Sequence, residues 1–185
     1  KDYQKAIAYC NLLDGKYELS KAEKNGYTGY EQVFMADNDQ NVQAMKEIIL
    51  PIRQDGAKTK CYSGANYLVS STRITGMPYI GTSNGWSCNF SRAALVKKFF
   101  STIEDCPLAT EAAPKDATEA DIIALDKAAG TTTKDVQAKA NDDRALFYSG
   151  CGGGLRKLQA DQIAGFNSGL SIVKWSNIRT DGAAT

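Results

Sequence analysis

The chain has 185 residues and contains no histidine, which narrows the chemistry its side chains can perform. Histidine is the usual general base for a serine or cysteine nucleophile, and it is the commonest metal ligand in proteins. Its absence excludes a Ser-His-Asp triad and an HExxH zinc site within this sequence. Carboxylate chemistry is the catalytic option that remains.

The carboxylates that could serve as acid and base are Glu47, Asp55, Asp142 and Asp143. A glycosidase needs two carboxyl groups about 5 to 9 Å apart, one of them with a raised pKa. Structural roles explain these residues more simply. Asp55 precedes Gly56 in a turn sequence, and Asp142 and Asp143 stand directly before Arg144, which favours an ion pair or a cap. We therefore expect no catalysis, with a carboxylate glycosidase as an alternative that release of reducing sugar would reveal.

A loop region in the middle of the chain combines aromatic rings with amide and guanidinium groups, a composition suited to binding a neutral sugar. A sugar presents a face of C–H groups, which an aromatic ring can cover, and an edge of hydroxyls, which fixed donors and acceptors can bind. Arginine can bind paired hydroxyls and also stack on rings. The aromatic residues are Tyr62, Tyr67, Tyr79 and Trp86, and the polar ones are Asn66, Arg73, Asn84 and Asn89.

Structural roles are the alternative for each of these side chains. Trp86 lies between a glycine-rich turn and a predicted helix, so its ring could pack under that helix as a staple. Arg73 could bridge loop carbonyls instead of binding a ligand, and Tyr62 could be a packing residue. Trp175 lies on a predicted strand and is expected in the core.

Two other motifs look like ligand sites but lack required residues. An EF-hand loop starting at Asp37 would need glycine and glutamate where Val42 and Ile48 stand, so Asp37 to Asp39 is predicted to form a capped turn. The glycine-rich run after Cys151 lacks the lysine and the Ser/Thr of a P-loop and is predicted to be a flexible loop. We expect no metal and no cofactor.

Composition favours a globular domain with a neutral partner. Apolar residues make up 43% of the chain, and the formal net charge is +1 with acids and bases interspersed. This charge gives no reason to expect nucleic acid or an anionic membrane surface as partner. No run approaches the roughly 18 consecutive apolar residues of a membrane span.

The cysteines are odd in number and share no CxxC spacing, so they indicate neither a zinc knuckle nor a complete disulfide framework. We expect mostly free thiols that are buried or half-buried. A single disulfide between Cys61 and Cys88 is the alternative in an oxidising setting. The five residues are Cys10, Cys61, Cys88, Cys106 and Cys151.

Hydrophobic periodicity predicts an amphipathic helix over Asp2–Leu13, ending where Gly15 can adopt a left-handed conformation. Tyr30–Ala36 is predicted to be a short helix or turn. A second amphipathic helix is predicted to open at Ser91 and to run to Phe100.

Four segments are predicted to be strands or strand-like: Glu47–Ile52, Tyr67–Thr72, Arg144–Tyr148 and Leu170–Trp175. In the last of these, alternation places Val173 and Trp175 on one face. Residues 107–143 are poor in aromatics and are predicted to be a variable insertion peripheral to the core. Within it, Thr118 and Asp121 form a capping-box variant before a short helix that stops at Gly130.

Several motifs together resemble the SusD/RagB family of surface glycan-capture lipoproteins of Bacteroidetes. These are Glu47–Ile52 (EIILPI), Asp55-Gly56, Gly85-Trp86, Ser91-Arg92 with Leu95-Val96, and Asp143–Phe147 (DRALF). The resemblance covers nearly the whole chain. It implies a mainly α, SusD-like fold, in which a TPR-type helical scaffold carries a loop-rich, partly β elaboration.

The resemblance also implies that the chain is a central fragment of one SusD-like domain. Its four parts would be residues 1–46 (end of the helical scaffold and a loop), 47–106 (strand, ligand-facing loop and helix), 107–143 (variable helical insertion) and 144–185 (strand and turn). The lipid anchor of such proteins lies outside the matched region.

The function implied is non-catalytic capture of oligosaccharide or polysaccharide at the outer-membrane surface and its delivery to a SusC-type TonB-dependent transporter. Carried over to this sequence, the strongest glycan-binding candidates are Trp86 and Tyr62, followed by Tyr79, Asn84 and Arg73. The alternative is a surface protein–protein interaction or adhesion module, because tyrosine and tryptophan are also enriched at protein interfaces.

Overall fold

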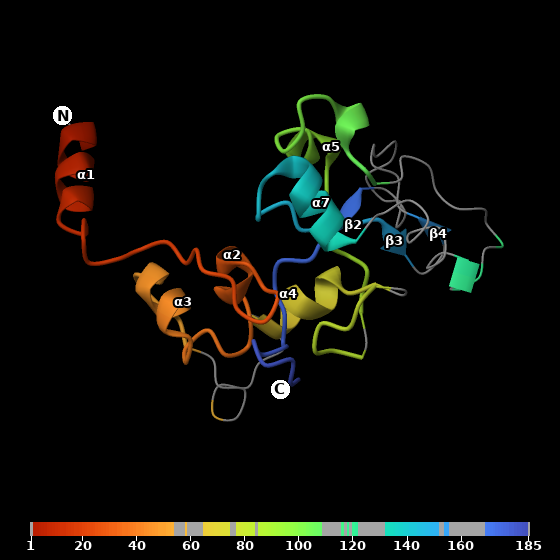
Figure 1. The fold of residues 1–185 in the computed structure, drawn as a ribbon, viewed down its shortest axis with the longest axis horizontal. Helices are drawn as coiled ribbons and strands as arrows, with labels where there is room; N and C mark the ends of the chain where they lie inside the picture. Colours follow the sequence, from red (N-terminus) through yellow and green to blue (C-terminus); the bar gives the residue numbers. More distant parts are fainter. Residues whose placement is uncertain are drawn as a thin grey trace.

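The computed structural model describes residues 2–53, 58, 65–74, 77–83, 85–108, 116, 118, 120–121, 132–151, 154–155 and 169–184. In this part of the chain, helices contribute more residues than strands, and helices α5 (Ala93–Val96) and α7 (Thr133–Ala140) lie near the strands while α1 (Asp2–Asn11) lies far from them (Figure 1). The architecture is therefore mainly α with a small β part. Tyr62, Asn84, Asp55, Cys61 and the predicted helix after Asp121 lie outside the described residues.

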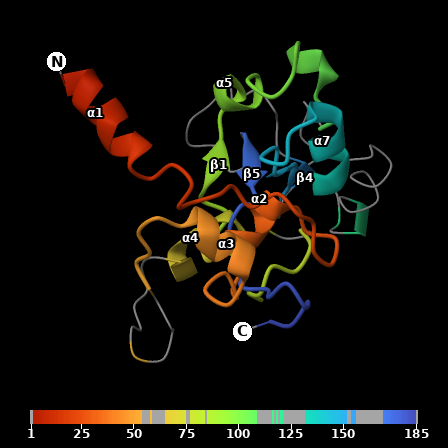
Figure 2. The ribbon, with the colours of Figure 1, turned by 60° about the vertical axis from the view of Figure 1, so that its left-hand side comes forward.

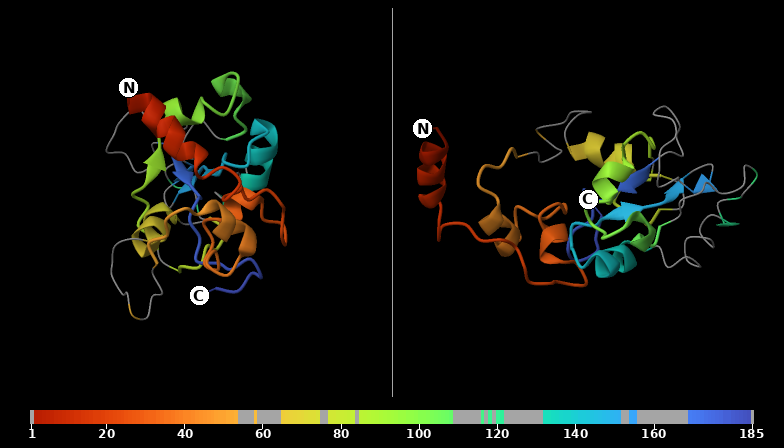
Figure 3. Two further views of the ribbon diagram at one scale, coloured as in Figure 1. Left: turned by 90° about the vertical axis from the view of Figure 1, so that its left-hand side faces the viewer. Right: turned by 90° about the horizontal axis from the view of Figure 1, so that it is seen from above.

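Helix α1 (Asp2–Asn11) confirms the first predicted helix, and it stands apart from the rest of the described chain (Figure 3). None of its residues is buried, so Tyr3 and Ile7 of its apolar stripe face solvent here. Gly15, in the turn after the helix, has a φ of 72°, a conformation that favours glycine. No helix in the described ranges is both long and apolar enough to cross a membrane.

Side chains cap the next two helices, α2 (Gly29–Gln32) and α3 (Val42–Glu47). At α2, the backbone N–H of Thr28 donates to Glu31 Oε2 over 2.8 Å, and the Glu31 N–H donates back to Thr28 Oγ1 over 3.3 Å. At α3, Asn41 Oδ1 accepts from Gln43 N over 3.1 Å. These short-range caps fix where each helix begins.

The predicted strand over Glu47–Ile52 is wrong. Glu47 ends helix α3, and residues 48–53 belong to no helix or strand. Leu50 and Ile52 are largely exposed, so this apolar run has no buried face in the described part of the chain. The sequence analysis predicts no helix here, but Asn41 caps helix α3, and Glu47 is the last residue of that helix.

The predicted strand over Tyr67–Thr72 is also wrong, because helix α4 spans Ala65–Thr72. Its polar side chains remain compatible with a helix because their hydroxyls bond back to the preceding turn. Ser71 Oγ donates to Leu68 O over 3.1 Å, and Thr72 Oγ1 donates to Val69 O over 3.1 Å. Val69 is buried and anchors the helix to the core.

Three short antiparallel strands form the sheet, in the order β1 (Phe90–Ser91), β5 (Leu170–Ile172) and β2 (Phe147–Tyr148). Figure 2 shows β1 beside β5. Phe90 pairs with Ser171, and Phe147 pairs with Ile172. The strands predicted at 144–148 and 170–175 are therefore confirmed over shorter ranges. A separate two-stranded sheet pairs β3 (Gly150–Cys151) with β4 (Gly154–Leu155), so Cys151 and Gly154 lie in strands where a flexible loop was expected.

Helix α5 (Ala93–Val96) begins after Arg92, so the predicted start at Ser91 is wrong. Ser91 is instead in strand β1, and its Oγ donates to Leu170 O across the sheet over 3.1 Å. The α-helix ends at Val96, and turns continue to Phe100. A 3₁₀ turn follows at Ile103–Asp105.

The first core cluster packs helices α5 and α7 (Thr133–Ala140) against the sheet. Leu108 and Val136 belong to this cluster, so the expectation that residues 107–143 are peripheral is wrong at both positions. The predicted cap at Thr118 is confirmed, since the Asp121 N–H donates to Thr118 Oγ1 over 3.2 Å. The buried members are Val96, Phe100, Cys106, Leu108, Val136, Ala145, Phe147 and Leu170.

The second core cluster lies beneath α4 and the loop that follows it. It contains Val69 from the helix, the loop residues Ile74, Met77 and Ile80, and Tyr148 from β2. Val173 and Trp175 pack on this cluster and so share a face, as predicted. Trp175 follows strand β5 and is half-buried, so it lies at the edge of the core and not within it. Burial of Ile74, Met77 and Ile80 anchors the loop that carries the exposed Tyr79.

The C-terminal segment makes hydrogen bonds to two distant parts of the chain, the turn at Asp37 and the loop after α4. The Asp37 carboxylate accepts from Thr180 N over 2.9 Å and from Thr180 Oγ1 over 2.6 Å. Asn177 N donates to Ile80 O over 2.9 Å and so connects this segment to the loop after α4. Asp37 does lie in a turn, as predicted, and its carboxylate also makes this long-range connection.

Two of the described cysteines are exposed, whereas mostly buried or half-buried thiols were expected. Cys10, Cys88 and Cys106 are all free thiols, but only Cys106 is buried, while Cys10 and Cys88 are exposed. The free thiol of Cys88 contradicts the alternative of a disulfide at that residue. Burial raises the pKa of the Cys106 thiol, so its reactive thiolate is scarce.

We expect a thiol reagent at neutral pH to label Cys88 in the folded chain much faster than Cys106. Accessibility and thiolate population both favour the exposed residue. Mass spectrometry of the labelled peptides over time measures the two rates, and labelling in urea provides the control in which they converge. Equal rates in the folded chain would show that Cys106 is not buried as described.

Candidate functional site

Two of the aromatic rings singled out in the sequence meet at the surface. The rings of Tyr67, from α4, and Trp86, from the loop before β1, have centroids 5.8 Å apart and planes inclined at 56°. Tyr67 is 47% exposed and Trp86 is 44% exposed, so both keep substantial area open to solvent. Such a pair can cover the apolar face of a ligand.

The end of helix α4 holds the backbone around Trp86. The last carbonyls of a helix have no partner within it. Here the loop supplies their donors: Trp86 N donates to Ser70 O over 2.8 Å, and Cys88 N donates to Ser71 O over 3.0 Å. These bonds clamp the loop to the helix that carries Tyr67.

Gly85 makes this clamp sterically feasible. A Cβ at position 85 would lie 2.0 Å from the Arg73 carbonyl oxygen and 2.6 Å from Arg73 Cγ. A backbone contact of that kind cannot be relieved by a side-chain rotation. Position 85 must therefore be glycine, because only a residue without a side chain fits against Arg73. This close approach sets where the next residue, Trp86, presents its ring at the surface.

Arg73 bridges loop carbonyls, which was the structural alternative for this residue. Its Nη1 donates to Ile74 O over 3.1 Å and to Pro78 O over 3.3 Å, and it also contacts Met77 O. The guanidinium thereby fastens residues 77–78 to the end of α4. A direct contact between Arg73 and a ligand stays a prediction.

Tyr79 is exposed on the loop that Arg73 fastens. Gly81 has a φ of 84°, and a Cβ there would lie 2.4 Å from Asn177 Cβ, so the loop passes close to the C-terminal segment. The structure thus places Arg73, Tyr79 and Trp86 around the end of α4. Tyr62 and Asn84 lie outside the described residues, and Tyr67 was not among the strongest candidates from the sequence.

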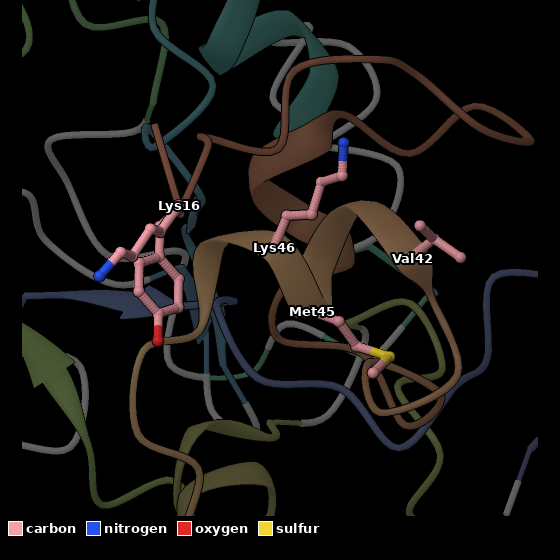
Figure 4. Close-up of a pocket in the computed structure, with 5 residues that line it drawn as sticks. Lys16, Val42, Met45 and Lys46 are labelled. Carbon is pink, nitrogen blue, oxygen red and sulfur yellow. The ribbon is translucent and has the colours of Figure 1, made fainter. Parts of the chain in front are cut away.

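One hollow in the described part of the chain lies away from these rings. It has a volume of about 330 Å³ and lies between the extended segment after α1 and helix α3, lined by Lys16, Tyr17, Val42, Met45 and Lys46 (Figure 4). None of the predicted site residues lines it. Tyr17 contributes the single aromatic ring among these lining residues, so the hollow lacks the paired rings found at α4.

A second hollow, of about 310 Å³, brings together carboxylates weighed for catalysis. Asp142 and Asp143 line it with Glu23. The Arg144 guanidinium donates to Asp142 through Nε over 2.9 Å and Nη2 over 2.7 Å, which confirms the predicted ion pair. These hydrogen bonds lower the pKa of Asp142, whereas a glycosidase acid needs a raised one.

Glu47, another carboxylate weighed for catalysis, has a structural partner. Its Oε2 accepts a hydrogen bond from the backbone N–H of Ser20 over 2.8 Å. Among the carboxyls of the described residues whose pKa is displaced, every shift is downward. Within the described part of the chain, no group of three or more cysteine, aspartate or glutamate side chains could hold a metal ion.

Replacing Arg144 with alanine is expected to raise the pKa of Asp142. Because the folded-state pKa is lowered, the pair stabilises the fold above the pKa of the unfolded state, and this contribution is lost as the pH falls through the folded pKa. Carbon-detected NMR titration of the Asp142 carboxyl measures the change, with Arg144→Lys as a variant that keeps the charge but not the planar fork. An unchanged pKa in Arg144→Ala would contradict the assigned cause.

The chain is SusD-like in sequence over nearly its whole length, which confirms the resemblance predicted from its motifs. It is 53% identical over 98% of its residues to "Starch-binding protein SusD" of Bacteroides thetaiotaomicron. The chain spans 32% of the length of that relative, which is about a third of it. No family model matches the chain.

Proposed function

We propose that the protein captures a neutral glycan without catalysis and that Trp86 provides the main sugar-contacting ring. The observation that carries this proposal is the 53% identity to a protein named for starch binding. The exposed rings of Tyr67 and Trp86 beside α4 supply a surface of the required kind, because aromatic rings cover the C–H faces of sugars. An α-glucan such as starch is therefore the first ligand to test.

The other candidate residues of the site have different proposed roles. Arg73 holds the loop through its carbonyl contacts, and any contact it makes with sugar comes in addition to that role. Tyr79 is exposed beside it and could meet a longer glycan. For Tyr62 and Asn84 the proposal rests on the sequence alone.

For the whole protein we propose the arrangement implied by the SusD-like resemblance. A lipid anchor outside this chain would hold it at the outer-membrane surface, where it would pass glycan to a SusC-type TonB-dependent transporter. A TPR-type helical scaffold would cover the apolar stripe of α1, whose Tyr3 and Ile7 are exposed here. An uncovered stripe of this kind is typical of a helix that packs on others.

Titration calorimetry of the full-length protein against a panel of soluble glycans tests the proposed function. Saturable binding of starch fragments, with no release of reducing sugar, is the expected result. Release of reducing sugar would favour a carboxylate glycosidase instead. If no glycan gave saturable heat, the rings at α4 would be better explained as a protein interface.

A further inference from the structure

We propose that Tyr67 is a positioning residue, whose ring fixes the orientation of the Trp86 indole before the sugar binds. This inference rests on the proposed function, since it assigns a role within the same site. Tyr67 was not among the strongest candidates from the sequence. The two rings are in contact, and a hydrogen bond from Trp86 N to Ser70 O holds the Trp86 backbone to the helix that carries Tyr67.

An exposed indole on a loop would normally exchange between several rotamers, and ordering it on binding costs entropy. Tyr67 limits that freedom because its ring lies against the indole at a centroid distance of 5.8 Å. The inclination of 56° means that the tyrosine supports the indole without stacking flat over it, and Trp86 stays 44% exposed. A ring that is ordered in advance binds its ligand more tightly.

The backbone geometry makes the two rings a single unit. Tyr67 is on α4, and Trp86 N is bonded to Ser70 O of the same helix, one turn further on. Gly85 allows this approach because its Cα lies against Arg73 with no room for a side chain. The position of the indole is thus set from two directions, by the Gly85 backbone and by the Tyr67 ring.

The first test needs no glycan. The full-length protein is labelled with 5-fluorotryptophan, and the ¹⁹F resonance of Trp86 is assigned by its absence in Trp86→Phe. We expect Tyr67→Ala to move this resonance toward that of the unfolded protein and Tyr67→Phe to leave it in place. The Trp175 resonance reports whether the core beneath α4 is intact in each variant, because Trp175 packs on that cluster.

A second variant perturbs the same ring from the backbone side. Gly85→Ala is expected to move the Trp86 resonance as well, since its Cβ would lie 2.0 Å from Arg73 O. Leu95→Ala is the matched control, because Leu95 is a similarly exposed (42%) apolar helical residue on α5. The control should leave both tryptophan resonances unchanged.

The second test measures affinity for starch fragments in the same variants. Loss of one aromatic contact predicts a decrease of about twofold to tenfold for Tyr67→Ala and little change for Tyr67→Phe, which keeps the ring. An unmoved Trp86 resonance in Tyr67→Ala would overturn the positioning role. Equal losses in the alanine and phenylalanine variants would overturn it too, because the hydroxyl would then act on the sugar directly.

The two tests separate this inference from the proposed function. If the wild-type protein binds no glycan, the proposed function fails, and the resonance test still decides whether Tyr67 orients Trp86. If Trp86→Ala loses binding while Tyr67→Ala keeps full affinity, the function stands and the positioning role is overturned.

Discussion

Trp86→Ala is expected to weaken glycan binding by about thirtyfold or more, the loss typical of a central aromatic contact residue. The ring is exposed, and the Trp86 backbone is held through its N–H bond to Ser70 O, which the alanine variant keeps. The change should therefore remove the sugar-contacting surface while the loop stays in place. Calorimetric titration with starch fragments measures the loss.

Two controls make that result specific. Trp86→Phe keeps part of the aromatic area and should bind with intermediate affinity. The urea unfolding midpoint of Trp86→Ala should stay close to wild type, because the side chain lies outside both core clusters. Undiminished binding by Trp86→Ala would remove the site assignment but would leave the SusD-like resemblance untouched.

Phe147→Ala is expected to lower the free energy of unfolding by about 3 to 5 kcal/mol. Phe147 is 2% exposed within the first core cluster, and its ring packs edge-on against Phe99 with centroids 5.3 Å apart at 76°. Truncation leaves a cavity between the sheet and α5 and removes an aromatic pair. Equilibrium urea unfolding of the full-length protein measures the effect.

Phe147→Leu and Leu95→Ala are the matched comparisons for that prediction. The leucine variant keeps most of the buried volume and should cost far less, while the exposed Leu95 should cost little. A loss below about 1 kcal/mol for Phe147→Ala would show that this cluster is not the centre of the core.

Elements specified by short-range signals were predicted well from the sequence. The periodic stripe of α1, the left-handed Gly15 and the cap at Thr118 each depend on residues within a few positions of one another. The Asp142–Arg144 ion pair was predicted for the same reason, because its partners are two residues apart. Local chemistry decides these features, so a single sequence reveals them.

Short apolar runs were predicted less well. Tyr67–Thr72 is rich in β-branched and aromatic residues and was predicted as a strand, yet it is the helix α4. Periodicity does not distinguish a buried strand from a short helix over so few residues. What decides the outcome is tertiary: Val69 packs into the second core cluster, and the hydroxyls of Ser71 and Thr72 are satisfied within the helix.

Because residues 67–72 were predicted as a strand, the contact between Tyr67 and Trp86 was not predicted. On a strand, Tyr67 would project from a sheet, whereas on α4 it lies beside Trp86 because residues 86–89 return to the end of that helix. The bonds from Trp86 N and Cys88 N join residues more than a dozen positions apart, and the sequence carries no local signal for them. The Gly85-Trp86 motif was recognised, but the reason for its glycine required the approach of Arg73.

Composition was a poor guide to burial in residues 107–143. A segment rich in alanine, threonine and charged residues was expected at the periphery, yet Val136 and Leu108 lie in the core. One or two apolar side chains are enough to anchor a polar helix, and an average over the segment conceals them. The burial of Val136 also explains why α7 packs against β2.

A crystal structure of the full-length protein bound to a starch oligosaccharide tests the central claim most directly, through the distance between the sugar and the Trp86 indole. The predicted result is a sugar ring in van der Waals contact with the indole, at about 4 Å, with Tyr67 holding the indole from its other side. An oligosaccharide bound in the hollow between α3 and the segment after α1, with Trp86 left free, would contradict the claim.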